Sequence, residues 1–309
     1  MPFSLSTIRI FKIQGSVSSV DEDSLQAALI PADIGGVARL DGFTSWSDNI
    51  DTSVVSSNGV ILLRHGRATK TLAKGELKSA VDERVANGAV PSTRLNSDTQ
   101  ERLLRDLKQS VTSYPILIDP VSGLALFGSA SEAQVNAARM QLHAVAPDLK
   151  LTALSANNVS NLLCCWMEGS LPLPAGIAFG RNAVLTNPVN QSATLFRDQE
   201  LPNDVVLEQI ARHGRIVTKL SLEWAGAMAF TVEDPMTLSG VGPSPALKRK
   251  LNSVKEPTER ATLEKELAIW LEHLRPLLTC VTAEFESKPY VAPAATEATL
   301  PWIFNGRAA

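Results

Sequence analysis

The chain has 309 residues, of which 44% are hydrophobic and 20% are charged, a composition typical of a folded globular protein. The net charge of −3 excludes a protein coated in basic surface, and three cysteines exclude a disulfide framework or a four-cysteine zinc site. No apolar run approaches the roughly 18 residues of a membrane span and the N-terminus lacks a secretory pattern, so the cytoplasm is the expected compartment.

The first half of the chain predicts a β-α-β-β opening followed by helices. Strands are expected at 7–13, 54–55 and 60–64, with a short helix between the first two that opens at a Ser19/Glu22 capping box. A loop is expected from 35 to 46, with Trp46 packed. Helices over 73–87 and 98–111 are rich in charge and predict a helical subdomain, at about 73–111, that projects from the sheet.

The second half predicts further alternation of strands and helices. The expected elements are a hairpin at 115–119 and 124–127, a helix at 131–144, a strand at 150–154, a helix at 158–167, strands at 177–179 and 193–196, and a helix at 203–212. A Gly/Pro-rich loop with a basic patch at 248–250, a long helix over 256–284 and a loose tail after Ser287 complete the chain. The Pro-rich connector 169–176 divides an N-terminal half, 1–168, from a C-terminal half, 169–309. The fold class is α+β, with antiparallel or mixed sheets and flanking helices.

The segment from Gly214 to Trp224 has the clearest pattern in the chain. It alternates between apolar and polar residues, which predicts a half-buried strand, and the run 228–232 follows at hairpin distance. The alternation places Arg215 and Lys219 on one polar face, with Val217 among them. Such a face can follow the phosphates of a nucleic acid, and it can equally be a solvated face with ion pairs such as Lys219 with Glu223.

The string Arg64-His65-Gly66 is similar to the signature of histidine phosphatases, in which the histidine takes the phosphoryl group and the arginine holds its oxygens. A phosphohydrolase is therefore one alternative function. The second copy, Arg212 to Arg215, follows a helix, and we expect both tetrapeptides to be exposed turns. Asp119 and Asp234 are expected to form turns. No other catalytic or metal-binding motif is present, so we expect no catalytic residue, metal or cofactor.

Further cations accompany the predicted strands, namely Arg64, Arg67 and Arg197. Aromatic residues are few and scattered, which favours contact with a nucleic-acid backbone over base stacking. An interaction scaffold that does not bind DNA is a further alternative.

Several segments in the same order resemble the RdgC family of bacterial recombination-associated proteins. They are the string G-R-I-V-T-K-L-S-L-E-W at 214–224, the hairpin 118–124, the passage 179–185 with Gln199-Glu200-Leu201, Thr71-Leu72 with the helix behind it, and the tryptophans Trp46 and Trp166. The chain is identified as a diverged member of this family.

The resemblance implies a homodimer closed into a ring around duplex DNA, bound without sequence preference. It also implies residence in the cytoplasm with the nucleoid, restraint of RecA-driven strand exchange through shared DNA, and no known catalysis. Carried over by position, Arg197 and Gln199 line the ring, while Asp198 stands where the family tends to be basic. From the cation pattern of the strands, we expect Arg215, Lys219, Arg64 and Arg67 to contact phosphates as well. The family's dimer gate corresponds to Leu104 to Lys108, so Arg105, Leu107 and Lys108 are the expected gate residues.

Overall fold

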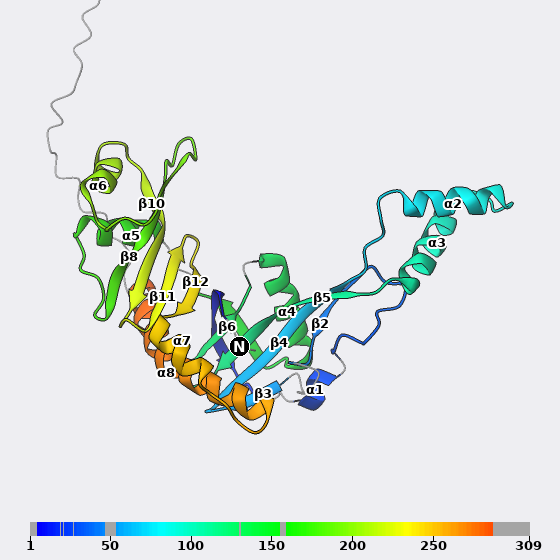
Figure 1. The fold of residues 1–309 in the computed structure, drawn as a ribbon, viewed down its shortest axis with the longest axis horizontal. Helices are drawn as coiled ribbons and strands as arrows, with labels where there is room; N and C mark the ends of the chain where they lie inside the picture. Colours follow the sequence, from blue (N-terminus) through cyan, green and yellow to red (C-terminus); the bar gives the residue numbers. More distant parts are fainter. Residues whose placement is uncertain are drawn as a thin grey trace, which may run out of the picture.

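Twelve strands and eight helices make up the part of the chain that the computed structural model describes, which is residues 5–18, 20, 22–26, 28–46, 54–129, 131–154 and 159–286 (Figure 1). The strands are β1 (Thr7–Gly15), β2 (Arg39–Phe43), β3 (Val54–Ser57), β4 (Val60–Thr69), β5 (Ser110–Asp119), β6 (Leu124–Phe127), β7 (Leu149–Ala153), β8 (Ile177–Thr186), β9 (Ala193–Phe196), β10 (Ile216–Trp224), β11 (Met228–Glu233) and β12 (Thr237–Pro243). The helices are α1 (Glu22–Gln26), α2 (Glu76–Ala86), α3 (Thr93–Asp106), α4 (Glu132–Val145), α5 (Val159–Glu168), α6 (Asp204–Ala211), α7 (Pro245–Asn252) and α8 (Glu259–Glu286). The fold is α+β, as predicted, and Ser19 and the tail after residue 286 lie outside the described residues.

The strands join into one sheet in the order β2-β4-β5-β6-β1-β12-β11-β10-β8-β9, with β3 on β4 and β7 on β1. Every strand pair is antiparallel. The first strand is the junction: its start pairs with β12, its middle with β6 and its end with β7. The two halves of the chain therefore share a sheet, and the proposed division at residue 169 stays a prediction.

The sheet is buried on both faces near β1 and on one face beyond it. Ile8 and Ile10 enter one core, while Phe11 enters the other, as strand alternation requires. The first core also contains buried side chains of α5, α6, α7 and α8, and the second contains those of α1 and α4. Figure 1 shows α7 and α8 on one side of the sheet and α4 on the other. Beyond β12 the face on the α4 side carries no helix from the described residues.

Helices α2 and α3 connect β4 to β5 and project from one end of this antiparallel strand pair (Figure 1). Helix α2 has no buried residue, and α3 buries Leu95, Thr99 and Leu104. The two helices are linked by Arg84 of α2, whose Nη1 donates to the Thr99 hydroxyl of α3 at 2.7 Å. The projecting helical pair expected from the sequence is present, and we call it the arm.

Several expected boundaries are wrong for reasons of tertiary packing. The predicted loop at 35–46 contains β2, and the loop after Asp234 contains β12 and α7, because these short segments are completed by neighbours far away in the chain. Strand β4 continues to Thr69 instead of ending near residue 64, since β5 pairs with it along its whole length. Helix α3 begins at Thr93, where the Ser92 side chain caps it, and Val111 lies in β5.

A buried ion pair attaches α8 to the N-terminal half. Asp119, at the end of β5, accepts hydrogen bonds from Arg275 of α8 at 2.7 and 3.0 Å. Its carboxylate also accepts from the Val121 N–H, so Asp119 does shape its turn as expected. The Asp119 side chain is only 3% exposed, and pairing with Arg275 compensates the charge of its carboxylate. This contact fixes the helical layer beneath the sheet.

Candidate nucleic-acid interface

Strands β8, β10, β11 and β12 have one face in the core and an uncovered, polar face on the side of the sheet where α4 lies. On β10 it carries Lys219, Ser221 and Glu223, while Leu220 and Leu222 point into the core. The residues opposite Lys219 and Ser221 on β11 are Glu233 and Thr231. Antiparallel sheets commonly leave one face to solvent with this alternation of buried and polar residues. We call this surface the open face.

The alternation in β10 is interrupted, contrary to our expectation. The pairing with β8 shifts register between Val217 and Lys219, and Val217 is fully buried instead of sharing the polar face. Arg215 precedes the strand, and its Nη1 donates to the Ser192 carbonyl at 2.9 Å. A β-bulge changes the side to which the following residues point. Arg215 and Lys219 therefore do not belong to one unbroken polar row.

Lys219 is partly neutralised on the open face. Its Nζ lies 2.7 Å from the Glu233 carboxylate on the neighbouring strand, and not beside Glu223 as the sequence suggested. Glu233 also accepts a short hydrogen bond from the Ser239 hydroxyl. Partial burial by itself would raise the pKa of Glu233, but the hydrogen bonds from Lys219 and Ser239 outweigh it and hold that pKa below its usual value. Glu233 is thus an anion at neutral pH.

The loop after β9 is tied to a bulge in β8. The Gln199 N–H donates to the Arg181 carbonyl at 3.1 Å, and the Arg181 Nη2 donates to the Asp198 carbonyl at 2.7 Å. The Asp198 N–H in turn donates to the Asn182 side chain at 3.2 Å. These contacts place Arg197 and Gln199, both exposed, beside Arg181 at one end of the open face.

The bulge itself is held against β10. The Ser221 hydroxyl accepts from the Asn182 N–H at 2.7 Å, and a Cβ atom at Gly180 would lie 2.5 Å from that hydroxyl oxygen. Glycine at position 180 therefore permits the close approach. Arg181 is a cation of this surface that sequence reasoning missed. The available signal was the Arg181-Asn182 pair inside an apolar strand, which is where a bulge exposes two consecutive residues.

Arg64 and Arg67 lie elsewhere, on β4, which five strands separate from β10 in the sheet order. The Arg64 guanidinium donates to the Trp46 carbonyl at 2.6 Å and lies over the Trp46 ring at 5.9 Å. The Arg67 Nε lies 2.6 Å from Asp41. Burial lowers the pKa of Arg64. Both side chains are engaged by the protein, and the structure does not bring them to the open face.

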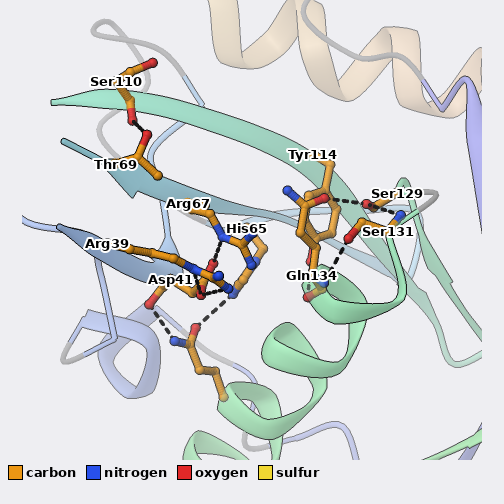
Figure 2. Close-up of polar contacts among 11 residues, drawn as sticks. Arg39, Asp41, His65, Arg67, Thr69, Ser110, Tyr114, Ser129, Ser131 and Gln134 are labelled. Atoms are coloured by element: carbon orange, nitrogen blue, oxygen red, sulfur yellow. Dashed lines mark hydrogen bonds and ion pairs between the residues drawn. The ribbon is translucent and has the colours of Figure 1, made fainter. Parts of the chain in front are cut away.

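His65 is buried in the N-terminal half, and Figure 2 shows its side chain among those of Asp41, Arg67 and Tyr114. It is 1% exposed, its ring meets Phe43 edge-on at 5.4 Å, and its Nε2 lies 2.9 Å from the Gln141 side-chain oxygen. Burial lowers its pKa. The tetrapeptide 64–67 is therefore the middle of a strand and not an exposed turn, whereas 212–215 does follow the end of α6. An imidazole enclosed in this way cannot reach a phosphoryl group, because a nucleophile must approach its substrate to bonding distance.

The expected gate residues lie at the base of the arm. Arg105 pairs with Glu101 on α3 at 2.5 Å, Leu107 caps the helix, and Lys108 is exposed. Within the described ranges, no group of three or more His, Cys, Asp or Glu residues is arranged to hold a metal ion. No helix of that part of the chain is long and apolar enough to cross a membrane.

Two comparisons with known proteins agree on one family. A family model described as "Putative exonuclease, RdgC" matches residues 5–288. The "Recombination-associated protein RdgC" of Colwellia psychrerythraea is 22% identical over 251 residues, which cover 77% of this chain and 80% of that protein. The matched residues include the arm, both cores and the open face.

Proposed function

This chain belongs to the RdgC family, and we propose that it binds duplex DNA without sequence preference and acts in recombination. The observation that carries the proposal is the open face. It is an uncovered face of a sheet that is buried on both faces near β1, and it has exposed Arg181, Arg197 and Gln199 at one end. Amine and guanidinium groups on a strand face can follow phosphates without reading bases.

The proposed mechanism is electrostatic. Lys219, Arg181, Arg197 and Gln199 contact phosphates directly, and Arg215, with two donors directed at Ser192, supports the turn between β8 and β9. Arg64 and Arg67 are bonded to Trp46 and Asp41, so we assign them a structural role in the N-terminal half and leave them out of the interface. The net positive charge of the open face is moderate because Glu233 neutralises Lys219. Binding should therefore be of moderate strength, and each phosphate contact that is made should add to its salt dependence.

We further propose that two copies close a ring through the arm, with Arg105, Leu107 and Lys108 at the gate. A ring would hold duplex DNA on the nucleoid and restrain RecA-type strand exchange by occupying the shared DNA. The proposed role requires no catalysis. The word exonuclease in the family description is tested directly by incubating an end-labelled duplex with the protein and Mg²⁺ or Mn²⁺, and we expect the label to stay at full length.

The experiment that tests DNA binding is fluorescence anisotropy with a random duplex across a salt series. The variant Arg197→Ala with Lys219→Ala should bind all sequences more weakly and lower the salt slope by about 2, or about 0.9 for each lost phosphate contact. The matched control is Arg260→Ala with Lys265→Ala, since these α8 cations are paired with Glu264 and Glu256 on the other side of the sheet. Equal affinity of the two double variants would remove the open face from the interface.

Ring closure has its own test. A closed ring should be retained on circular duplex after a high-salt wash and should slide off the same DNA once it is linearised. Equal loss from both forms would show an open clamp or a simple surface contact.

A further inference from the structure

Helix α7 carries exposed cations on the opposite side of the sheet from the open face. The helix is positioned by Leu247 and Leu251, which are buried in the core beneath the sheet, and by Ser244, whose hydroxyl accepts from the Leu247 N–H. The remaining surface of α7 presents Lys248, Arg249 and Lys250 to solvent, as their exposure shows. Lys255, also exposed, follows in the loop before α8.

Most acidic side chains around these cations already have partners. Lys250 pairs with Glu272 at 3.0 Å, Lys265 pairs with Glu256 at 2.6 Å, and Arg260 pairs with Glu264 at 3.1 Å. Within the described part of the chain, none of the ion pairs includes Lys248, Arg249 or Lys255. We call these three residues the α7 patch. Its charge is not cancelled by a bonded neighbour, in contrast to Lys219 on the open face.

A purely structural role explains only part of this arrangement. Cations in the last turn of a helix interact favourably with the helix dipole, which accounts for Arg249 and Lys250. Lys248 lies before that turn, and Lys255 lies three residues beyond the end of α7, so neither has this role. A cluster of unpaired cations at fixed positions is the kind of surface that a polyanion binds.

The location of the α7 patch decides which polyanion it can hold. Leu247 and Leu251 enter the core on one face of the sheet, while Lys219 and Glu233 lie on the other face. Duplex DNA is stiff over roughly 150 base pairs, so a short duplex lying on the open face cannot fold around the molecule to reach α7. Any duplex bound by α7 is therefore a separate segment.

We propose that the α7 patch binds the phosphates of a second DNA duplex, so that one protein molecule holds two duplex segments at once. This inference rests on the proposed function of the open face as the first duplex site. Phosphate contacts carry no sequence information, so the two segments need not be related in sequence.

The test is capture of a second duplex. A biotinylated 30-base-pair duplex on beads is saturated with the full-length protein, and a fluorescent duplex of unrelated sequence is then added. The variant Lys248→Gln with Arg249→Gln should capture roughly tenfold less of the fluorescent duplex, with a salt slope for capture that is lower by about 2. The control Arg260→Gln with Lys265→Gln changes the net charge equally on the adjacent helix, but removes cations that are already paired.

The outcomes separate the two proposals. Normal binding of the bead duplex by all proteins, with second-duplex capture lost only in the α7 variant, supports the inference. Binding of the bead duplex without capture of the second by the wild type overturns the inference and leaves the open-face proposal standing. Equal capture by the α7 variant and the control also overturns it, since the second duplex would then be held elsewhere. Failure of the wild type to bind the bead duplex refutes both.

Discussion

The Arg275–Asp119 ion pair provides a sharp test of how the two halves of the chain are joined. Replacement of Arg275 by methionine keeps most of the apolar stem but removes both hydrogen bonds to Asp119 and a third, at 3.1 Å, to the Asn58 carbonyl. The Asp119 side chain is 3% exposed in the intact pair, and after the change the Val121 N–H would be its remaining hydrogen-bond donor among those we observe.

The expected cost follows from the burial of the two partners. Removal of one member of a buried pair typically costs about 3–5 kcal/mol, because it leaves an uncompensated charge in the core. Arg275 is 28% exposed, so water can reach the site once it is removed, and we expect about 3 kcal/mol. At about 2 °C per kcal/mol for a chain of this size, the melting temperature should fall by about 6 °C.

Urea and thermal unfolding followed by circular dichroism measure this loss. A double-mutant cycle of Arg275→Met with Asp119→Asn should give a coupling energy of about 2 kcal/mol, since the two side chains are in direct contact. The control Lys265→Met removes an exposed pair and should cost less than about 1 kcal/mol. A loss for Arg275→Met no greater than that of the control would refute the docking of α8 against the end of β5.

Two substitutions and one thiol-labelling experiment test other parts of the structure. Glu233→Gln should free Lys219 and raise duplex affinity several-fold at low salt, with a steeper salt slope; unchanged binding would mean that Lys219 does not contact phosphate. The pKa of Glu233 is lowered in the folded state, so its contribution to stability is present above the unfolded-state pKa and is lost as the pH falls through the folded-state pKa. Glu233→Gln should therefore also flatten the acid side of the stability–pH profile. Gly36→Val should displace the arm, because a Cβ atom at position 36 would lie 2.9 Å from the Glu101 carbonyl oxygen. Limited proteolysis should then cut faster within 73–109 while the helix content of the rest of the protein is kept. An unchanged cleavage pattern would contradict this packing. Burial raises the pKa of Cys164 to about 11, and its sulfur accepts a hydrogen bond from the Val217 N–H. At pH 8, iodoacetamide should therefore label this thiol slowly in the folded protein and rapidly in urea. Equal labelling rates would show that the contact between α5 and β10 is absent.

The sequence by itself predicted the elements that carry a strong local pattern. Strand β10, helix α4 and the long helix α8 have a period of 2 or 3.6 residues, and the hairpin β5–β6 consists of two apolar runs around a turn. The order of the short family-like segments identified the family. The prediction of an α+β chain with a projecting helical pair needed nothing beyond these patterns. The sequence also predicted two cations of the open face, Lys219 and Arg197, together with the neutral Gln199 beside them.

Only the tertiary structure decided which of these cations are available. Arg64 and Arg67 resemble other strand cations in the sequence, yet their guanidinium groups are bonded to Trp46 and Asp41, because residues far away in the chain supply the acceptors. His65 resembles a catalytic histidine and is enclosed by β2, β5 and α4. A bulge within β10 buried Val217, and cross-strand pairing chose Glu233 as the partner of Lys219. Local patterns report the period of one segment, whereas burial, register and ion pairing depend on segments that meet only after the chain has folded.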